Sequence, residues 1–249
     1  MEYQKNLMTT TLSAPFIFYT VVPHLNNSAQ VALDEANQAF QSNNFQQTLA
    51  GYKKALQAAP TSGHLLSNLG ALLSSQGLVD EGVKNLNKAL EFDKKCVGAY
   101  YNLGTLLINS NMFEQAQRFL EQAVGLDPEH SAALNNLGIA LFHQQKLDEA
   151  HNMFEKALAA NNDFDFACHN IGCIEFEKSN MKDAIAWFDK ALAMNPKNFT
   201  TLNSLGCCFF IENQTDKALE MYKKSIALSP RYRMPYYNIG FMAIEKKLI

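Results

Sequence analysis

The sequence predicts an all-α solenoid, in which pairs of helices repeat along the chain and stack on one another. Three observations support this prediction. A glycine returns every 34 residues, small and large apolar residues return at fixed distances after it, and prolines close several of the resulting units. The chain has 249 residues, 47% of them hydrophobic, so it can build a continuous core between stacked units.

The periodic glycines lie inside stretches that otherwise read as helix. They are Gly70, Gly104, Gly138, Gly172, Gly206 and Gly240. Each lies in a short motif such as NNLGIALF, residues 135–142. Inside a helix, glycine lowers helix stability by about 1 kcal/mol relative to alanine. A costly residue that recurs at a fixed spacing needs a structural reason, and close packing of two helices is the reason we expect.

Two further sets of residues keep the same period. Twelve residues after the glycine position come the small residues Thr48, Gly82, Ala116, Ala150, Ala184 and Ala218. Four residues later come the large residues Tyr52, Leu86, Leu120, Phe154, Phe188 and Tyr222. We expect each glycine of a first helix to make room for the large residue of the second helix in its unit.

Helix ends can also be placed from the sequence. In the third unit, apolar residues recur with helical spacing over residues 98–110 and again over 112–126. Residues suited to a left-handed turn lie between the two helices of four units, at Asn43, Gly77, Asn111 and Asn213. Pro60, Pro128, Pro196 and Pro230 then end the second helix, because proline cannot continue a helix interior.

These residues resemble the tetratricopeptide repeat (TPR), with its L-G…A-x3-F…A…P pattern on a 34-residue period. The family's first-helix tryptophan is replaced by other residues, which are Leu66, Tyr100, Leu134, Cys168, Leu202 and Tyr236. The resemblance implies a right-handed α-α solenoid of six full repeats and a half repeat. The repeats are 29–62, 63–96, 97–130, 131–164, 165–198, 199–232 and the partial 233–249, after an extended N-terminal segment, 1–28.

The resemblance also implies that the first helices line a concave groove. One groove position carries the residues Asn68, Asn102, Asn136, Asn170 and Asn238, with Asp34 and Ser204 in the other units. This asparagine ladder is similar to that in the TPR superhelix of O-GlcNAc transferases. A side-chain amide both donates and accepts, so a row of them can bind the backbone of an extended peptide of any sequence. Alternatively, the amides bond only to neighbouring helices.

Two more groove positions complete the expected peptide-binding site. One contributes Tyr101, Asn135, His169 and Asn203, and the other contributes the apolar stripe Ile108, Phe142, Phe176 and Phe210. The stripe either contacts a peptide or packs against the next first helix. Charged residues are nearly absent from these positions, so the expected partner is an extended, largely uncharged peptide or protein segment.

Other chemistry is not indicated. His169, Cys173 and Cys207 could in principle approach a zinc ion, but no paired Cys-x-x-Cys supports a site, and we expect no metal or cofactor. No phosphate-binding loop, nucleophile elbow or H-E-x-x-H motif is present, so no catalytic residue is predicted. The net charge of −3 makes nucleic acid a poor partner.

Cellular location is inferred from the cysteines and the apolar runs. Five cysteines, an odd number without a regular framework, predict free thiols in a reducing compartment, so we expect a cytoplasmic protein. No apolar run approaches the ~20 residues that span a bilayer. The longest candidate, residues 14–22, is short and is followed by Pro23.

The two ends suggest intramolecular or intermolecular docking. Residues 9–24 read as an extended segment that docks along the solenoid, either in its own groove or on a neighbouring chain, and the final helix is apolar almost all round. Either end could join copies of the chain. The predicted function is a non-catalytic scaffold or adaptor that binds an extended peptide or partner protein. The alternatives are a substrate-recognition module of a larger enzyme system, such as a glycosyltransferase, and a self-assembling structural protein.

Overall fold

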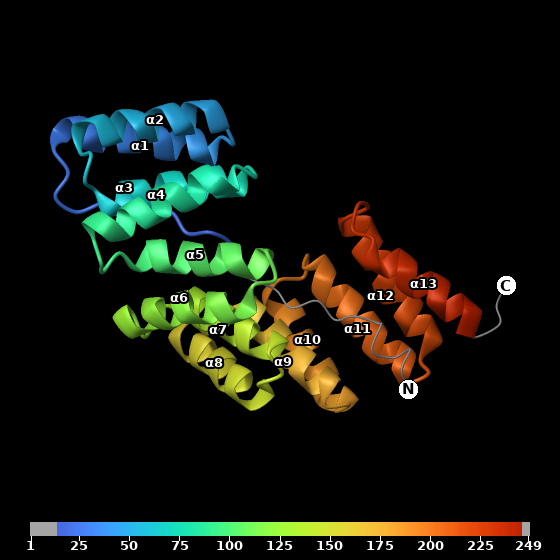
Figure 1. Ribbon diagram of the computed structural model, residues 1–249. Coiled ribbons are helices and arrows are strands. Elements are labelled where there is room, and N and C mark those ends of the chain that lie inside the picture. The colour runs from blue at the N-terminus through green and yellow to red at the C-terminus, as the bar shows by residue number, and fades with distance from the viewer. Residues whose placement is uncertain (1–13, 246–249) are drawn as a thin grey trace. The chain divides into compact units, whose positions relative to one another are not determined.

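The computed structural model describes residues 14–245, which contain thirteen α-helices and no β-strand (Figure 1). The first helices of the units are α1 (Asn27–Gln41), α3 (Gly63–Ser75), α5 (Val97–Asn109), α7 (Ser131–His143), α9 (Asp165–Glu177), α11 (Phe199–Ile211) and α13 (Met234–Glu245). The second helices are α2 (Phe45–Ala58), α4 (Val79–Phe92), α6 (Phe113–Leu126), α8 (Leu147–Ala160), α10 (Met181–Met194) and α12 (Thr215–Leu228). Among the described helices, none has the length and apolar character that crossing a membrane requires.

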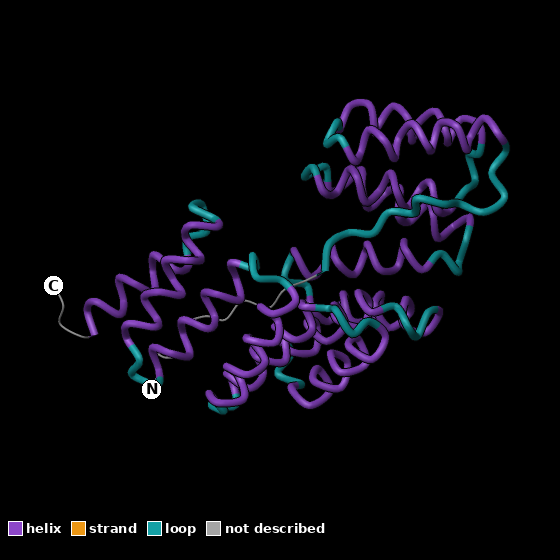
Figure 2. Tube along the Cα trace, turned by 180° about the vertical axis from the view of Figure 1, so that it is seen from behind, coloured by secondary structure: helices purple, strands orange, loops and turns teal. Residues whose placement is uncertain are grey.

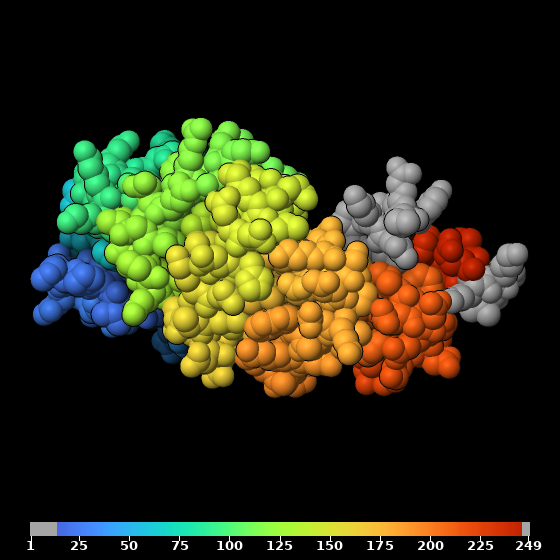
Figure 3. Space-filling view, turned by 90° about the horizontal axis from the view of Figure 1, so that it is seen from below, coloured from blue at the N-terminus to red at the C-terminus, as the bar shows by residue number. Residues whose placement is uncertain are grey.

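The chain forms two compact units, which we describe separately. The N-terminal unit comprises residues 14–140, and the C-terminal unit begins at Leu141. In the N-terminal unit, α1 packs on α2, α3 on α4, and α5 on α6, while the first helices α3 and α5 contact each other. In the C-terminal unit, α9 pairs with α10 and α11 with α12, and α11 also contacts α9 and α13. The surface of this unit follows chain order from yellow to red (Figure 3).

Four of the periodic glycines, Gly70, Gly104, Gly172 and Gly206, pack against the large residues of the second helices, as predicted. A Cβ atom added to Gly104 would lie 2.5 Å from Leu120 Cγ, and one added to Gly206 would lie 2.6 Å from Tyr222 Cε1. Leu120 and Tyr222 are fully buried. The glycine therefore trades intrinsic helix stability for close contact between the two helices of a unit.

The turns between paired helices are left-handed at the four positions predicted. Asn43, Asn111 and Asn213 have φ of 52°, 57° and 58°, and Gly77 has φ of 80°. The same turn position in the remaining units holds Gln145 and Ser179, each with φ of 63°. These two residues carry no sequence signal for a left-handed conformation, so their turns can be placed only from the 34-residue period.

The first helix begins at Asn27, slightly before the predicted start of the first repeat at residue 29. Helix α1 begins at Asn27 because the side-chain oxygen of Asn26 accepts a hydrogen bond from the N–H of Ala29 at 2.8 Å and caps the helix. Residues 14–26 are non-helical. The predicted extended conformation of residues 1–13 and the last four residues of the half repeat lie outside the described part of the chain.

Candidate functional site

Residues 14–22 bind to the first helices of the N-terminal unit. We call them the docked segment. The segment follows an extended path across these helices (Figure 2), and hydrogen bonds join it to α3, α5 and α7 of the same chain. The chain then turns back at His24, which has φ of 61°, to enter α1. The first-helix face of this unit is therefore occupied by the protein's own N-terminal region.

Three asparagines of the ladder each bind both backbone groups of one residue. Asn136 Oδ1 accepts from the N–H of Ala14 at 2.8 Å, and its Nδ2 donates to the Ala14 carbonyl at 3.2 Å. Asn102 binds Ile17 in the same way, at 2.9 Å and 3.1 Å. Asn68 binds Tyr19 at 2.7 Å and 2.8 Å. Each amide thus replaces the neighbouring strand that an extended backbone would otherwise need.

The same amides also bond to neighbouring first helices. Asn102 Nδ2 lies 3.3 Å from Ser67 Oγ on α3, and Asn136 Nδ2 donates to Thr105 Oγ1 on α5 at 2.9 Å. Each amide has two N–H donors, so one can point to the preceding helix and the other to the docked segment. The two interpretations of the ladder, structural and peptide-binding, therefore describe one geometry in this unit. The helix–helix bond fixes the orientation that the peptide bond requires.

Tyr101 adds a hydroxyl to the amide contacts. Its Oη lies 2.6 Å from the Pro15 carbonyl and 3.0 Å from the Ala14 carbonyl, and the one hydroxyl hydrogen is shared between them. Burial raises the pKa of this phenol far above its ordinary value, with smaller opposing contributions from hydrogen bonds to Thr105 and Asn136. The hydroxyl therefore stays protonated and acts as a donor to the segment's backbone.

One contact recognises a side chain of the docked segment, that of Tyr19. Tyr19 Oη accepts a hydrogen bond from the N–H of Gly98 at 2.6 Å, in the first turn of α5, where helix N–H groups lack intrahelical partners. A Cβ atom added to Gly98 would lie 2.5 Å from Tyr19 Cε2. The Tyr19 ring also meets His64 edge to face, with centroids 4.3 Å apart. This position favours a tyrosine, whereas the amide contacts are indifferent to sequence.

Apolar side chains anchor both ends of the docked segment. Ala14 is 2% exposed and Val22 is 4% exposed, and the ring of Phe18 packs on Phe40 with centroids 4.4 Å apart. The segment contains no charged residue. The segment that contacts the first helices is therefore uncharged and largely apolar.

Several of these contacts were not predicted as site residues. Besides Gly98, they are Asn37, whose Nδ2 donates to the Thr20 carbonyl at 3.0 Å, and the rings of Phe40 and His64. Asn37 and Phe40 occupy groove positions of the first repeat, so their positions could have identified them. The Gly98 contact depends on where a tyrosine of the segment falls, which periodicity does not specify.

The apolar stripe is buried rather than exposed. Ile108, Phe142 and Phe176 are each 7% exposed. Phe210 is half-buried and meets Phe241 edge to face, with centroids 6.0 Å apart. Asn135 is also buried, and its Nδ2 donates to Asn136 Oδ1 at 3.1 Å.

The remaining predicted residues belong to the C-terminal unit. His169 is buried, with Nδ1 2.9 Å from Thr201 Oγ1 and Nε2 3.4 Å from Cys173 Sγ. Asn170 is buried on α9, and Asn238 Nδ2 donates to Asn203 Oδ1 at 2.9 Å.

The cysteines of the described chain are buried thiols. Burial raises the pKa of Cys207 to about 12, so this thiol stays protonated and is a poor nucleophile. The five cysteines all lie within the described residues, and no disulfide joins them. Within residues 14–245, no three side chains of the kinds that bind metals are grouped as a candidate site.

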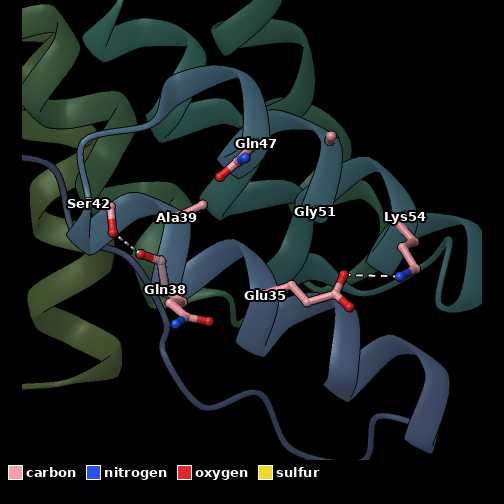
Figure 4. Close-up of a pocket in the computed structure, with 8 residues that line it drawn as sticks. Glu35, Gln38, Ala39, Ser42, Gln47, Gly51 and Lys54 are labelled. Atoms are coloured by element: carbon pink, nitrogen blue, oxygen red, sulfur yellow. Dashed lines mark hydrogen bonds and ion pairs between the residues drawn. The ribbon is translucent and has the colours of Figure 1, made fainter.

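A separate pocket of about 560 Å³ lies between α1 and α2 (Figure 4). Its rim carries an ion pair between Lys54 and Glu35 at 3.0 Å, and Ser42 Oγ donates to the Gln38 carbonyl at 3.1 Å. The ion pair is exposed, so it contributes little to stability. None of the ladder asparagines lines this pocket, and we assign it no part in peptide binding.

Family models for the tetratricopeptide repeat match residues 107–170, 167–198 and 187–220. Their span includes helix pairs with the glycine packing and left-handed turns described above. This is a tetratricopeptide repeat protein. No curated protein matches the TPR chain in sequence.

Solved structures share the fold of this TPR protein. pilF of Pseudomonas aeruginosa is 20% identical with a TM-score of 0.72, covering 86% of this chain and 97% of its own. PilW, a type IV pilus biogenesis factor, is 17% identical with a TM-score of 0.75, covering 86% and 99%. YrrB, a TPR protein with an unusual peptide-binding site, is 22% identical with a TM-score of 0.55, covering 76% and 97%. At these identities the likeness supports the fold alone.

Proposed function

We propose that this TPR protein is a non-catalytic scaffold that binds an extended, largely uncharged segment of a partner protein along its first-helix face. The observation that carries the proposal is the set of three paired contacts from Asn68, Asn102 and Asn136 to the docked segment. These contacts recognise backbone groups, so a segment from another protein can make them equally well. YrrB, a TPR protein with an unusual peptide-binding site, offers a precedent for this use of the fold.

The docked segment stands in for the partner in this proposal. A partner segment that takes the same place has to displace residues 14–22, and its affinity is lowered by the stability of the intramolecular contacts. A cytoplasmic location is part of this proposal, and it is supported by five cysteines that form no disulfide within the described residues. Recognition through neutral amides and a phenol favours an uncharged segment over an acidic or basic one.

The test converts the docked segment into a separable peptide. A protease site is inserted at the exposed turn residue His24, the purified chain is cut, and exchange of the released segment with a fluorescent peptide of sequence APFIFYTVV is followed by anisotropy. We expect the peptide to bind the cut chain, and Asn102→Ala to weaken it about tenfold by removing two backbone contacts. If the peptide fails to bind the emptied chain, or binds the Asn102→Ala chain equally well, the proposal is wrong.

A further inference from the structure

The sequence motif Tyr-Tyr-Asn-x-Gly occurs twice in the first helices, at residues 100–104 of α5 and at residues 236–240 of α13. In α5, its second tyrosine and its asparagine are Tyr101 and Asn102, which both bind the backbone of the docked segment. The 34-residue period places Tyr237 and Asn238 at the same two positions of α13. The C-terminal unit therefore carries a second copy of the residue pair that binds peptide in the N-terminal unit.

The asparagine of the second copy bonds to the preceding first helix, as Asn102 does. Its side-chain oxygen, however, accepts no hydrogen bond from an extended backbone within the described residues. Asn238 is fully buried, and its Nδ2 donates to Asn203 Oδ1 at 2.9 Å and lies 3.3 Å from Cys207 Sγ. This mirrors the bond from Asn102 to Ser67 on the preceding first helix. Asn238 Oδ1, however, has no hydrogen-bond partner, although the equivalent atom of Asn102 accepts the N–H of Ile17.

Two polar atoms of α11 are also unpartnered. Asn203 Nδ2 and Ser204 Oγ on α11 are buried without a hydrogen-bond partner. Buried polar atoms without partners cost free energy, and each needs an explanation. Asn203 Nδ2 and Asn238 Oδ1 belong to two amides that are hydrogen-bonded to each other, so this amide pair keeps one unpartnered donor on α11 and one unpartnered acceptor on α13. One donor and one acceptor are what a single residue of an extended backbone requires.

We propose that α11 and α13 form a second binding site for an extended peptide from a partner protein. Asn238 Oδ1 accepts the N–H of one peptide residue, and Asn203 Nδ2 donates to a carbonyl. The Tyr237 hydroxyl, on a side chain that is 55% exposed, donates to a carbonyl two or three residues earlier. That offset is the one Tyr101 and Asn102 show between Pro15 or Ala14 and Ile17.

The neighbouring side chains indicate an apolar peptide. Phe210 and Phe241 pair edge to face on α11 and α13, and the buried thiols of Cys207 and Cys208 lie on α11. This inference rests on the proposed function. It adds that a partner segment can bind while residues 14–22 keep their place in the N-terminal unit.

The test uses the full chain as bait for a phage-displayed library of random dodecapeptides. Enriched peptides are synthesised and their affinities measured for the wild type, Asn238→Ala, Asn102→Ala, Tyr237→Phe and the matched control Tyr236→Phe. Tyr236 is the adjacent tyrosine, and its hydroxyl donates to the Pro230 carbonyl at 3.1 Å. We expect a loss of about tenfold in Asn238→Ala, a smaller loss in Tyr237→Phe, and no change in Tyr236→Phe.

Peptides that bind Asn238→Ala as tightly as wild type, or a library that yields no binder, would overturn the proposal. If their binding is lost in Asn102→Ala instead, the second site is wrong while the scaffold function stands. If neither asparagine matters, the second site is wrong, and the exchange experiment with the cut chain decides the scaffold function separately. Tyr237→Phe keeps the test valid should Asn238→Ala unfold, because this exposed side chain loses only a hydroxyl.

Discussion

The side-chain amide of Asn102 binds both the N–H and the carbonyl of Ile17, 85 residues earlier in the chain, at 2.9 Å and 3.1 Å. A helix thereby supplies an extended backbone with the hydrogen bonds of a β-strand neighbour. Because the contact uses no side chain of Ile17, it carries no sequence specificity. Selectivity has to come from contacts such as that between Tyr19 and Gly98.

The first prediction concerns glycine packing. Gly104→Leu should destabilise the protein by about 1–3 kcal/mol, because the added side chain has to displace Leu120, which a Cβ alone would approach to 2.5 Å. The matched control is Gly240→Ala, at the same repeat position on α13, where an added Cβ meets no atom within 4 Å. Thermal or urea unfolding measures both. Equal stability of Gly104→Leu and wild type would contradict the packing argument.

A second prediction concerns the left-handed turns. Ser179→Gly should stabilise the protein by roughly 0.5–1 kcal/mol, because Ser179 has φ of 63°, which glycine adopts without steric cost. Asn43→Gly is the control, since asparagine already tolerates this conformation, and its effect should be smaller. Urea unfolding of the two variants decides the matter, and destabilisation by Ser179→Gly would refute it.

A third prediction concerns the selectivity contact. Gly98→Ala should release the Tyr19 ring, because the added Cβ would lie 2.5 Å from Cε2 and the ring has to move. Gly125→Ala is the control, with no atom within 4 Å of its Cβ. Proteolysis within residues 14–22 reports release of the segment. We expect faster cleavage in Gly98→Ala alone, and an unchanged rate would show that Tyr19 does not hold the segment.

A fourth prediction concerns pH. Burial lowers the pKa of His130 below its ordinary value of 6.5, although Asp127 acts in the opposite direction. His130 Nδ1 accepts from the N–H of Ala133 at 3.2 Å, and its ring stacks on Tyr101, so protonation removes an acceptor beside the docked segment. The native state therefore binds fewer protons than the unfolded state near and below pH 6.5. Stability from this group is complete above that pH and is lost as the pH falls through the lowered pKa.

The measurement is the free energy of unfolding at about pH 7.5 and about pH 5.5, on either side of the ordinary histidine pKa. The control is His130→Asn, which retains a capping acceptor but cannot be protonated. We expect its pH dependence to be weaker than that of wild type. Identical pH profiles for the two proteins would show that His130 does not cause the pH dependence of stability. His64, whose pKa burial also lowers, contributes in the same direction in both.

The repeat fold was predictable because the 34-residue period places the glycines, the large residues opposite them and most of the turn residues. The asparagine ladder was predictable for the same reason, since amide chemistry can be read from residue type. The register of the docked segment was not predictable. Which of its residues meet Asn68, Asn102 and Asn136 depends on the path from Val22 back to α1, and no periodic pattern encodes that path.

The turn at Ser179 and the contact of Gly98 show a second limit of prediction from the sequence. Both are set by tertiary structure that holds a backbone or a side chain in place, and neither residue type signals it. The unpartnered amide atoms of Asn203 and Asn238 show the reverse case. Their ladder positions were visible in the sequence, but their lack of hydrogen-bond partners required coordinates.

Native-state hydrogen exchange of the docked segment tests the central claim most directly. The N–H groups of Ala14, Ile17 and Tyr19 donate to asparagine oxygens, so they should exchange more slowly than those of Phe16 and Phe18. In Asn102→Ala, protection of Ile17 should fall by about tenfold or more, and more than that of Tyr19. Uniform exchange along the segment, or protection of Ile17 that survives the loss of Asn102, would contradict the account.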